Sequence, residues 1–270
     1  MTPKNKLVYM VSISITMIFL FFGKVNAGIY DDFTNIGIDA NKWKITGSGF
    51  SQPGDGYLYF NDKTADPSKL VSTMHYSSGV FTMLFSDYSS NNLAPANQNK
   101  GTIAGIGLSA GPTDYVRIER GQVLGSNGGP VGYLEVNWFD QNGVLQENYI
   151  NFPNTDFLSG ALQLRYDGSV VTFWYQGGTN GQWSQMMLTD HGQPLPDQNG
   201  QPQPFILTPD WITPVAMFIQ AYPGDPVYPN VTLSFKVDRV EAPVPEPITL
   251  LFLCSSLIGL VGLRRKFRNS

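Results

Sequence analysis

The segment 161–175 constrains the fold of this chain more than any other. Apolar and polar residues alternate in 161–166 and again in 169–175, and Asp167-Gly168 stands between the two runs. Alternation with a period of two indicates strands with one buried face, and Asp-Gly is a common turn between antiparallel strands. The sequence therefore predicts an antiparallel hairpin.

Several other runs alternate in the same way or are short and apolar, and turn residues bound them. They are 58–61, 80–85, 102–108, 115–120, 133–139, 144–150, 215–222 and 231–240. Long helical patterns are missing, so we expect an all-β protein in which two antiparallel sheets pack as a sandwich or jelly roll. The polar segments 87–100 and 191–204 are predicted to be long surface loops, and the second is an alternative domain boundary.

The first residues have the features of a secretory signal. Lys4 and Lys6 precede an apolar run over 7–22, and Val25-Asn26-Ala27 has the small residues that a signal peptidase recognises. We predict a signal peptide over 1–27, with a retained membrane anchor as the alternative. The run is shorter than the ~20 residues that usually span a bilayer.

The last residues, 244–270, form a second targeting segment. Val244-Pro245-Glu246-Pro247 precedes an uncharged apolar run over 248–263, and Arg264, Arg265, Lys266 and Arg268 follow it. This order resembles the PEP-CTERM sorting signal of Gram-negative bacteria. The resemblance implies a transient inner-membrane span, with the basic end in the cytoplasm, and an exosortase as partner. An ordinary single-span anchor is the alternative.

The segment between these ends, 28–243, contains no cysteine. An exported domain of this length is therefore expected to be held by its own core, or by a core and a metal ion. Ten Lys and Arg residues stand against twenty Asp and Glu residues, which is a net charge of −10. The sequence shows no basic patch, so we do not expect nucleic acid as a partner.

Three stretches of this segment resemble concanavalin A-like lectin and glucanase domains. They are the opening residues 30–43, the hairpin 161–175 with Trp183 beyond it, and the closing residues 235–240. The resemblance implies a single sandwich domain over 28–243. It also implies that the first and last strands lie side by side. Asp31, Asp32 and Asp238 would then meet and bind one structural Ca²⁺.

The resemblance also allows a test for catalysis. Laminarinase-type glycosidases of this superfamily carry Glu-x-Asp-x-x-Glu on one strand, and the nearest match is Glu135-Val136-Asn137-Trp138-Phe139-Asp140. Asn137 replaces the middle acid, and Asp140 is shorter than the second Glu. Glu135 and Asp140 are thus weak catalytic candidates, Glu135 is expected to face solvent or to pair with an arginine, and we predict that the protein is not an enzyme. The distant His75 and His191 do not suggest a zinc site.

Sugar binding needs only exposed aromatic faces and a few polar partners. The candidates are Trp138, Trp174, Tyr175, Trp183, Trp211 and Tyr222, whereas Trp43 is expected in the core. The sequence therefore favours an exported, exosortase-processed protein of the cell surface or extracellular matrix that binds polysaccharide. A divergent laminarinase-type glycoside hydrolase and a purely structural matrix module are the alternatives.

Overall fold

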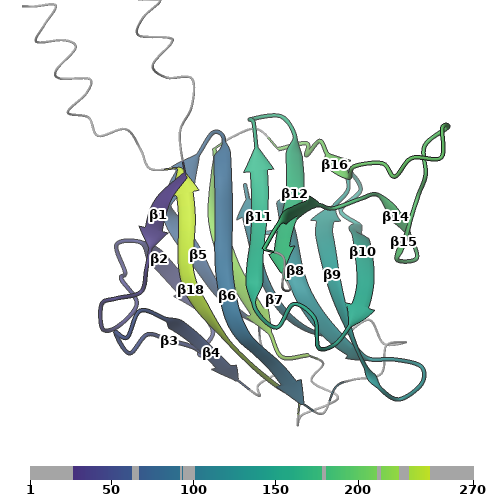
Figure 1. Ribbon diagram of the computed structural model, residues 1–270. Coiled ribbons are helices and arrows are strands. Elements are labelled where there is room, and N and C mark those ends of the chain that lie inside the picture. Colours follow the sequence, from purple (N-terminus) through teal and green to yellow (C-terminus); the bar gives the residue numbers. More distant parts are fainter. Residues whose placement is uncertain are drawn as a thin grey trace, which may run out of the picture. The chain divides into compact units, whose positions relative to one another are not determined.

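Alternating sequence patterns build two antiparallel β-sheets that pack face to face (Figure 1). The computed structural model describes residues 27–62, 67–91, 93, 101–177, 181–211, 214–224 and 231–243. All regular elements in these ranges are strands, which confirms the predicted all-β sandwich. Ala27 apart, the predicted signal peptide lies outside the described residues, as does the sorting segment 244–270 with Val244, Pro245, Glu246 and Pro247.

One sheet has nine strands. Its main path is β13 (Trp183–Gln185), β12 (Val171–Gly177), β11 (Gly160–Tyr166), β6 (Gly79–Asn91), β18 (Thr232–Pro243), β4 (Leu58–Asp62) and β3 (Phe50–Ser51). Two strands pair off this path, β1 (Ala27–Asp31) with β18 and β16 (Ile206–Leu207) with β12.

The other large sheet has seven strands. Their order is β10 (Leu145–Pro153), β9 (Pro130–Phe139), β8 (Tyr115–Leu124), β7 (Thr102–Ser109), β17 (Val215–Tyr222), β5 (Ser68–Tyr76) and β2 (Trp43–Thr46). A third, two-stranded sheet pairs β14 (Thr189–Asp190) with β15 (Gln193–Pro194). No helix in the described part of the chain is long and apolar enough to cross a bilayer.

The core lies between the two large sheets and is rich in aromatic rings. Phe60 and Phe235 stack with ring centres 5.4 Å apart, and Phe173 and Phe205 stack at 5.5 Å. Trp43 is 2% exposed, which confirms its predicted place in the core. Burying such rings provides much of the stability of a domain that lacks disulfides.

The predicted hairpin is present, but its loop is longer than expected. Tyr166 pairs with Val171, so four residues connect β11 to β12. The Asp167 carboxylate accepts hydrogen bonds from the backbone N–H groups of Ser169 and Val170, both at 2.8 Å. Asp167 thereby stabilises a wider loop than the two-residue Asp-Gly turn, and Gly168 supplies the positive φ of 100°.

The two predicted long loops are partly regular structure. β6 continues to Asn91, which pairs with Thr232 of β18, so 87–91 is strand and not loop. The register of β6 with β18 shifts between Ser234 and Lys236. In the second segment, β14 and β15 pair, and bridges join Met187 to Pro204 and Pro196 to Pro202. We call residues 187–204 the arm; Figure 1 shows it beside β10.

Strand β8 carries one arginine into the core. Arg120 is fully buried, and its guanidinium lies 4.7 Å from the ring centres of Tyr88 and Phe152. It donates hydrogen bonds to the backbone carbonyls of Gly121, Asn154, Asp156 and Phe157. Fixed carbonyl dipoles and ring faces thus replace the water that a guanidinium normally binds.

Candidate functional site

The outer face of the seven-stranded sheet, which is the face turned away from the core, carries a row of polar residues. The register pairs Gln220 with Gly105, Gly105 with Glu119, Glu119 with Glu135, and Glu135 with Tyr149. Paired residues of an antiparallel sheet project their side chains to the same face. Five strands therefore bring these residues into one line across the outer face.

A second row runs beside the first. It pairs Arg117 of β8 with Asn137 of β9, and Asn137 with Glu147 of β10. Glu147 is therefore a diagonal neighbour of Glu135 on the next strand, and side chains at such positions are within reach of each other. We call Arg117, Glu119, Glu135 and Glu147 the carboxyl cluster.

Contacts within the carboxyl cluster are direct. Arg117 Nε contacts Glu119 Oε2 in an ion pair whose members are both nearly buried, with 8% and 2% of their side chains exposed. Glu135 is partly buried, hydrogen bonds join its carboxyl to Glu119 and to Glu147, and Glu147 is exposed. The cluster therefore runs from an inaccessible carboxyl at Glu119 to an accessible one at Glu147.

Burial and charge give these carboxyls different proton affinities. Burial raises the pKa of Glu135 to about 9, and the negative charges of Glu119 and Glu147 add to this effect. Burial also raises the pKa of Glu119, but the adjoining Arg117 cation acts in the opposite direction. Because Glu119 contacts the guanidinium in an ion pair, we infer that Glu135 holds the proton at neutral pH.

Aromatic rings and one lysine surround the carboxyl cluster. Lys69 Nζ lies 3.8 Å from the ring centre of Phe218, and burial, followed by repulsion from Arg117, lowers the pKa of Lys69 to about 8. The Phe218 ring fills the space that a side chain at Gly107 would need. Glycine therefore lets the ring lie flat on the sheet, and the outer face combines ring faces with polar groups.

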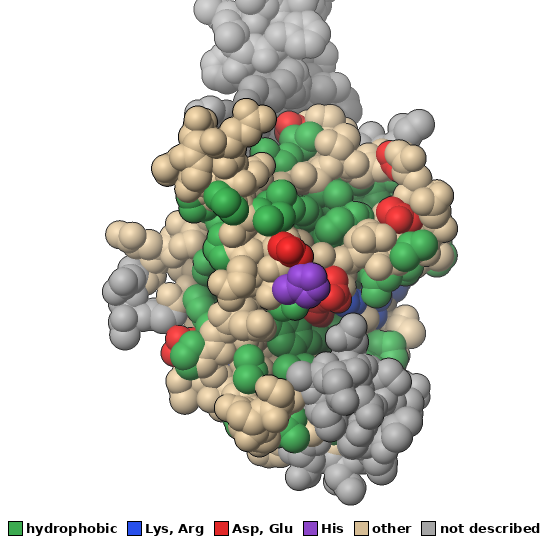
Figure 2. Space-filling model, turned by 90° about the vertical axis from the view of Figure 1, so that its right-hand side faces the viewer, with side chains coloured by type: hydrophobic (Ala, Val, Ile, Leu, Met, Phe, Trp, Pro, Cys, Tyr) green, Lys and Arg blue, Asp and Glu red, His purple; other side chains and the backbone are tan. Residues whose placement is uncertain are grey.

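The arm borders the outer face at strand β10. The backbone N–H of Thr189 donates to Asn148 Oδ1 at 2.8 Å, and a Cβ at Gly192 would lie 2.9 Å from Cε2 of Tyr149. The His191 side chain, which is 90% exposed, has Nδ1 2.6 Å from Asp190 Oδ1. Figure 2 shows the side of the molecule with β10 and the arm, where acidic side chains and histidine lie beside hydrophobic ones. His75 lies on β5, toward the other edge of the sheet, so the two histidines are not brought together.

The structure separates the two weak catalytic candidates. Glu135 belongs to the carboxyl cluster, where it adjoins two carboxyls, and the arginine contact belongs to Glu119. Asp140 follows β9, and its carboxylate accepts hydrogen bonds from the N–H groups of Asn142 and Val144 and from the Gln146 side chain. These bonds lower the pKa of Asp140. Asp140 therefore stabilises a turn and does not face Glu135 across the outer face.

The aromatic candidates lie in several places. Trp138 and Tyr175 are half-buried and pack against the core, where Trp138 lies 5.2 Å from Phe205. On β12, Trp174 alternates with the core residue Phe173, and Arg165 covers its ring at 4.0 Å. These three side chains therefore do not form one sugar-binding surface.

The remaining aromatic candidates do not complete one surface either, although Trp211 lines the same cavity as Trp138. Trp183 is on β13 at the edge of the nine-stranded sheet, and Trp211 lies edge-on to Tyr166 at 6.5 Å. Tyr222 ends β17 and pairs with Ile103, in the same alternation as Phe218 on the outer face. Of the six candidates, Tyr222 alone is on the face that carries the carboxyl cluster.

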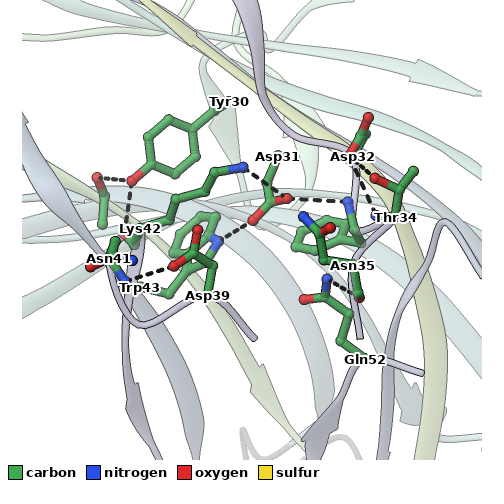
Figure 3. Close-up of polar contacts among 12 residues, drawn as sticks. Tyr30, Asp31, Asp32, Thr34, Asn35, Asp39, Asn41, Lys42, Trp43 and Gln52 are labelled. Carbon is green, nitrogen blue, oxygen red and sulfur yellow. Dashed lines mark hydrogen bonds and ion pairs between the residues drawn. The ribbon is translucent and has the colours of Figure 1, made fainter. Parts of the chain in front are cut away.

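The predicted calcium ligands come from strands that do lie side by side. β1 pairs with β18 from Ala27–Pro243 to Asp31–Val240. Figure 3 shows the Asp31 carboxylate between the ammonium of Lys42 and the indole of Trp43, at 3.3 and 2.7 Å. An ammonium group in contact with the carboxylate does not fit a Ca²⁺ ligand.

The other two predicted ligands also have protein partners. The Asp32 carboxylate accepts a hydrogen bond from the Thr34 hydroxyl at 2.9 Å, and Asp238 accepts one from Ser86 at 2.8 Å. Among the described residues, no group of three or more His, Cys, Asp or Glu side chains is arranged to hold a metal ion. The calcium site stays a prediction, and the placement of Asp31 does not support it.

Sequence reasoning missed Arg117, Glu119 and Glu147. The alternation in 115–120 already places Arg117 and Glu119 on one face of their strand, but the glycosidase motif lies within a single strand, 135–140. The register between strands brings the carboxyls together. A sequence pattern within one strand does not specify that register.

No family model matches the chain, and a search of curated proteins finds no similar sequence. Solved structures do match. A β-glucanase from Bacillus licheniformis has a TM-score of 0.52 and 14% identity, over 82% of this chain and 99% of that one. The Crh5 transglycosylase has a TM-score of 0.50 and 15% identity, over 82% of this chain and 88% of that one. The fold is therefore a concanavalin A-like jelly roll of the kind found in glucanases.

These matches correct the prediction that the protein is not an enzyme. Solved structures that share its fold include a β-glucanase and the Crh5 transglycosylase, which are enzymes. The prediction rested on the missing second acid of a one-strand motif, and the register adds Glu119 and Glu147 from neighbouring strands. The loss of that motif therefore does not argue against catalysis.

Proposed function

We propose that this protein is an exported glycoside hydrolase that cleaves β-glucan. The observation that carries the proposal is the carboxyl cluster on the outer face, where a carboxyl with a pKa raised to about 9 adjoins an exposed carboxylate. The fold that the chain shares with a β-glucanase supports the substrate class. The expectation of polysaccharide binding is retained, with hydrolysis added to it.

Glycoside hydrolysis requires an acid that protonates the leaving oxygen and a second carboxyl group on the other side of the bond. Glu135 fits the acid, because burial and neighbouring negative charge keep it protonated at neutral pH. Glu119 is inaccessible, so we assign it no contact with substrate. Its charge, held by Arg117, makes it a positioning residue that keeps the proton on Glu135.

Glu147 fits the second carboxyl group. It is exposed on β10, and a hydrogen bond joins it to Glu135. Carboxyls this close leave no room for the water that an inverting enzyme holds between groups ~6.5–9.5 Å apart. Substrate binding breaks this hydrogen bond when the sugar enters between the two groups. The arrangement therefore favours a retaining mechanism with Glu147 as nucleophile.

The two steps follow from these roles. Glu135 transfers its proton to the glycosidic oxygen as the bond to the anomeric carbon breaks, and a Glu147 oxygen bonds to that carbon. Water then attacks the same carbon, Glu135 takes the proton of the water, and Glu147 leaves as a carboxylate. Both side chains return to their initial protonation states, and the anomeric configuration is retained.

We also propose that the two ends of the sequence direct export and processing of the protein. A signal peptidase would remove 1–27, and an exosortase would recognise Val244-Pro245-Glu246-Pro247 and the segment after it. Residues 28–243 would then act at the cell surface or in the extracellular polysaccharide matrix. The absence of cysteine from these residues suits a domain whose packed aromatic core needs no disulfide.

The test is the release of reducing sugar from laminarin and from mixed-linkage β-glucan. Replacing the general acid Glu135 by Gln removes the transferable proton, so we expect activity to fall at least ~100-fold. The variant Glu147→Gln should fall to a similar extent, because an amide is a poor nucleophile. Proton magnetic resonance of the first product would show the β-anomer if the mechanism is retaining.

The matched control is Glu241→Gln. Glu241 is on β18 of the other sheet, where it pairs with Arg239 at 2.9 Å, so the change alters a carboxyl outside the carboxyl cluster. This variant should keep wild-type activity. Equal activity of the wild type and Glu135→Gln on both glucans would overturn the assignment of Glu135, and no activity in the wild type would overturn the proposed function.

A further inference from the structure

A cavity lined by none of the four residues of the carboxyl cluster lies at one end of the sandwich. Its volume is about 700 Å³, within the range typical of small-ligand sites. Three segments line it: the residues at the start of β8, the end of β9 with the following turn, and residues 207–211, which begin with the last residue of β16. Both large sheets contribute to its walls, so the folded sandwich is needed to form it.

Aromatic side chains form much of the wall. Tyr115 and Phe139 meet edge-to-face with ring centres 5.1 Å apart, and Trp138 and Trp211 also line the cavity. All four side chains are half-buried, so each is fixed by packing and still partly accessible. Such rings offer flat apolar faces to the C–H groups of a sugar.

The polar side of the cavity is acidic. Asp114 and Asp210 are exposed at its rim, and none of the described residues that line it is Lys or Arg. The carboxylate of the third acid, Asp140, already binds turn N–H groups and Gln146. Asp114 and Asp210 thus offer acceptors to hydroxyl groups, and the excess of negative charge disfavours anionic ligands.

The proposed acid lies away from the cavity along its strand. Glu119 is four positions from Tyr115 and Glu135 is four positions from Phe139, which corresponds to ~13 Å of extended strand. Glu147 is nearer, because it pairs with Asn137, two positions from Phe139, and Arg117 Cζ lies 5.7 Å from the ring centre of Tyr115. A hexose in the cavity therefore does not contact the acid Glu135, and the cavity adjoins the side of the carboxyl cluster that holds Arg117 and Glu147. A glucan that reaches the carboxyl cluster can place a more distant unit here.

We propose that this cavity is a non-catalytic binding site for a neutral hexose unit of a glycan. Ring faces of Trp138 and Trp211 stack on the sugar, and Asp114 and Asp210 accept hydrogen bonds from its hydroxyls. The ligand class rests in part on the proposed function, because β-glucan is the substrate considered there. The site itself rests on the cavity and its lining.

The test is calorimetric titration of laminaritetraose into the full mature protein carrying Glu135→Gln, which limits turnover. The double change Asp114→Ala and Asp210→Ala should weaken binding at least ~10-fold, as expected for the loss of hydrogen bonds to charged acceptors. Trp211→Leu should weaken it similarly, and circular dichroism would verify that each variant is folded. The control Asp156→Ala removes an exposed carboxyl that does not line the cavity and should leave binding unchanged.

If the double variant binds laminaritetraose as tightly as the parent protein, the proposed binding site is wrong. It is also wrong if the parent protein does not bind laminaritetraose. Assays of β-glucan hydrolysis by the wild type distinguish failure of the binding site from failure of the proposed function. If the wild type lacks glucanase activity but the double variant loses binding, the site stands and the carboxyl assignment fails. If binding depends on Glu147 and not on Asp114, Asp210 or Trp211, the cavity is not the binding site.

Discussion

The two sides of strand β8 each bury a charged side chain, and they satisfy it in different ways. On the inner side, the guanidinium of Arg120 donates its hydrogen bonds to backbone carbonyls and packs against two rings. On the outer side, Glu119 contacts Arg117 and adjoins Glu135, which in turn adjoins Glu147. Burial of charge is therefore common to both sides, and the partners differ.

Because of this difference, the buried charge on the inner side of β8 has a structural role and the buried charge on the outer side has a chemical one. Carbonyl groups have fixed positions and cannot exchange protons, so the surroundings of Arg120 hold the loop 154–157 against the sheet. Burial raises the pKa of Glu135, and competition for protons among the carboxyls in contact raises it further. Buried charge alone does not indicate a functional site. Contact between titratable groups of like charge is the more informative feature.

The largest predicted effect is on the inner side. Arg120→Ala removes a buried side chain and leaves several carbonyls without a donor, so we expect it to lower the free energy of unfolding by about 3–5 kcal/mol. Urea unfolding followed by tryptophan fluorescence would measure it. The control Arg165→Ala removes an exposed arginine that stacks on Trp174 and should cost less than about 1 kcal/mol. Similar losses in both variants would contradict a structural role specific to Arg120.

A smaller effect is predicted for the pH dependence of stability. A carboxyl whose pKa is higher in the folded state binds more protons there than in the unfolded chain, so stability falls as pH rises between the two values. For Glu135 this window extends from its ordinary value of 4.5 to about 9. Between about pH 5 and about pH 8, the wild type should lose ~2 kcal/mol more than Glu135→Gln, which stays uncharged.

Urea unfolding of both proteins over this pH range would measure the difference in slope. Glu241→Gln changes an ion-paired carboxyl of the other sheet and should follow the wild-type curve. Parallel curves for wild type and Glu135→Gln would mean that the outer face does not hold a proton at Glu135. The two sides of β8 would then not differ in proton binding.

The smallest effect is predicted at Asp140, the weak candidate that the sequence paired with Glu135. Asn keeps an oxygen that can accept hydrogen bonds from Asn142 and Val144, so Asp140→Asn should change the free energy of unfolding by less than about 0.5 kcal/mol. Glucanase activity should stay within about twofold of wild type. A loss comparable to that of Glu135→Gln would restore Asp140 as a catalytic residue.

Much of the fold was predictable from local patterns. Alternation within 115–120, 133–139 and 161–166 identified strands that the structure contains, and Asp167-Gly168 marked the hairpin. The predictions were wrong where partners overrode local composition, as at 87–91, where polar residues remain in β6 because they pair with β18. Local propensity is a weak guide where a neighbouring strand supplies hydrogen bonds.

The candidate site was predictable only in part. Glu135 was identified because it stands in a degenerate motif, whereas Glu119 and Glu147 are 16 and 12 residues away from it in sequence. Trp138 and Trp211 were identified as separate aromatic residues, and the packing of the two sheets places both in one cavity. Neither grouping follows from the spacing of residues along the chain.

The sequence by itself determined that this chain forms strands with apolar faces and that no disulfide stabilises residues 28–243, because side-chain alternation and composition are local properties. The tertiary structure decided which charged residues meet, since Glu119, Glu135 and Glu147 become neighbours only through the register of β8, β9 and β10. Register depends on hydrogen bonds and packing between strands distant in sequence. For that reason the proton affinity of Glu135 is a property of the folded sheet.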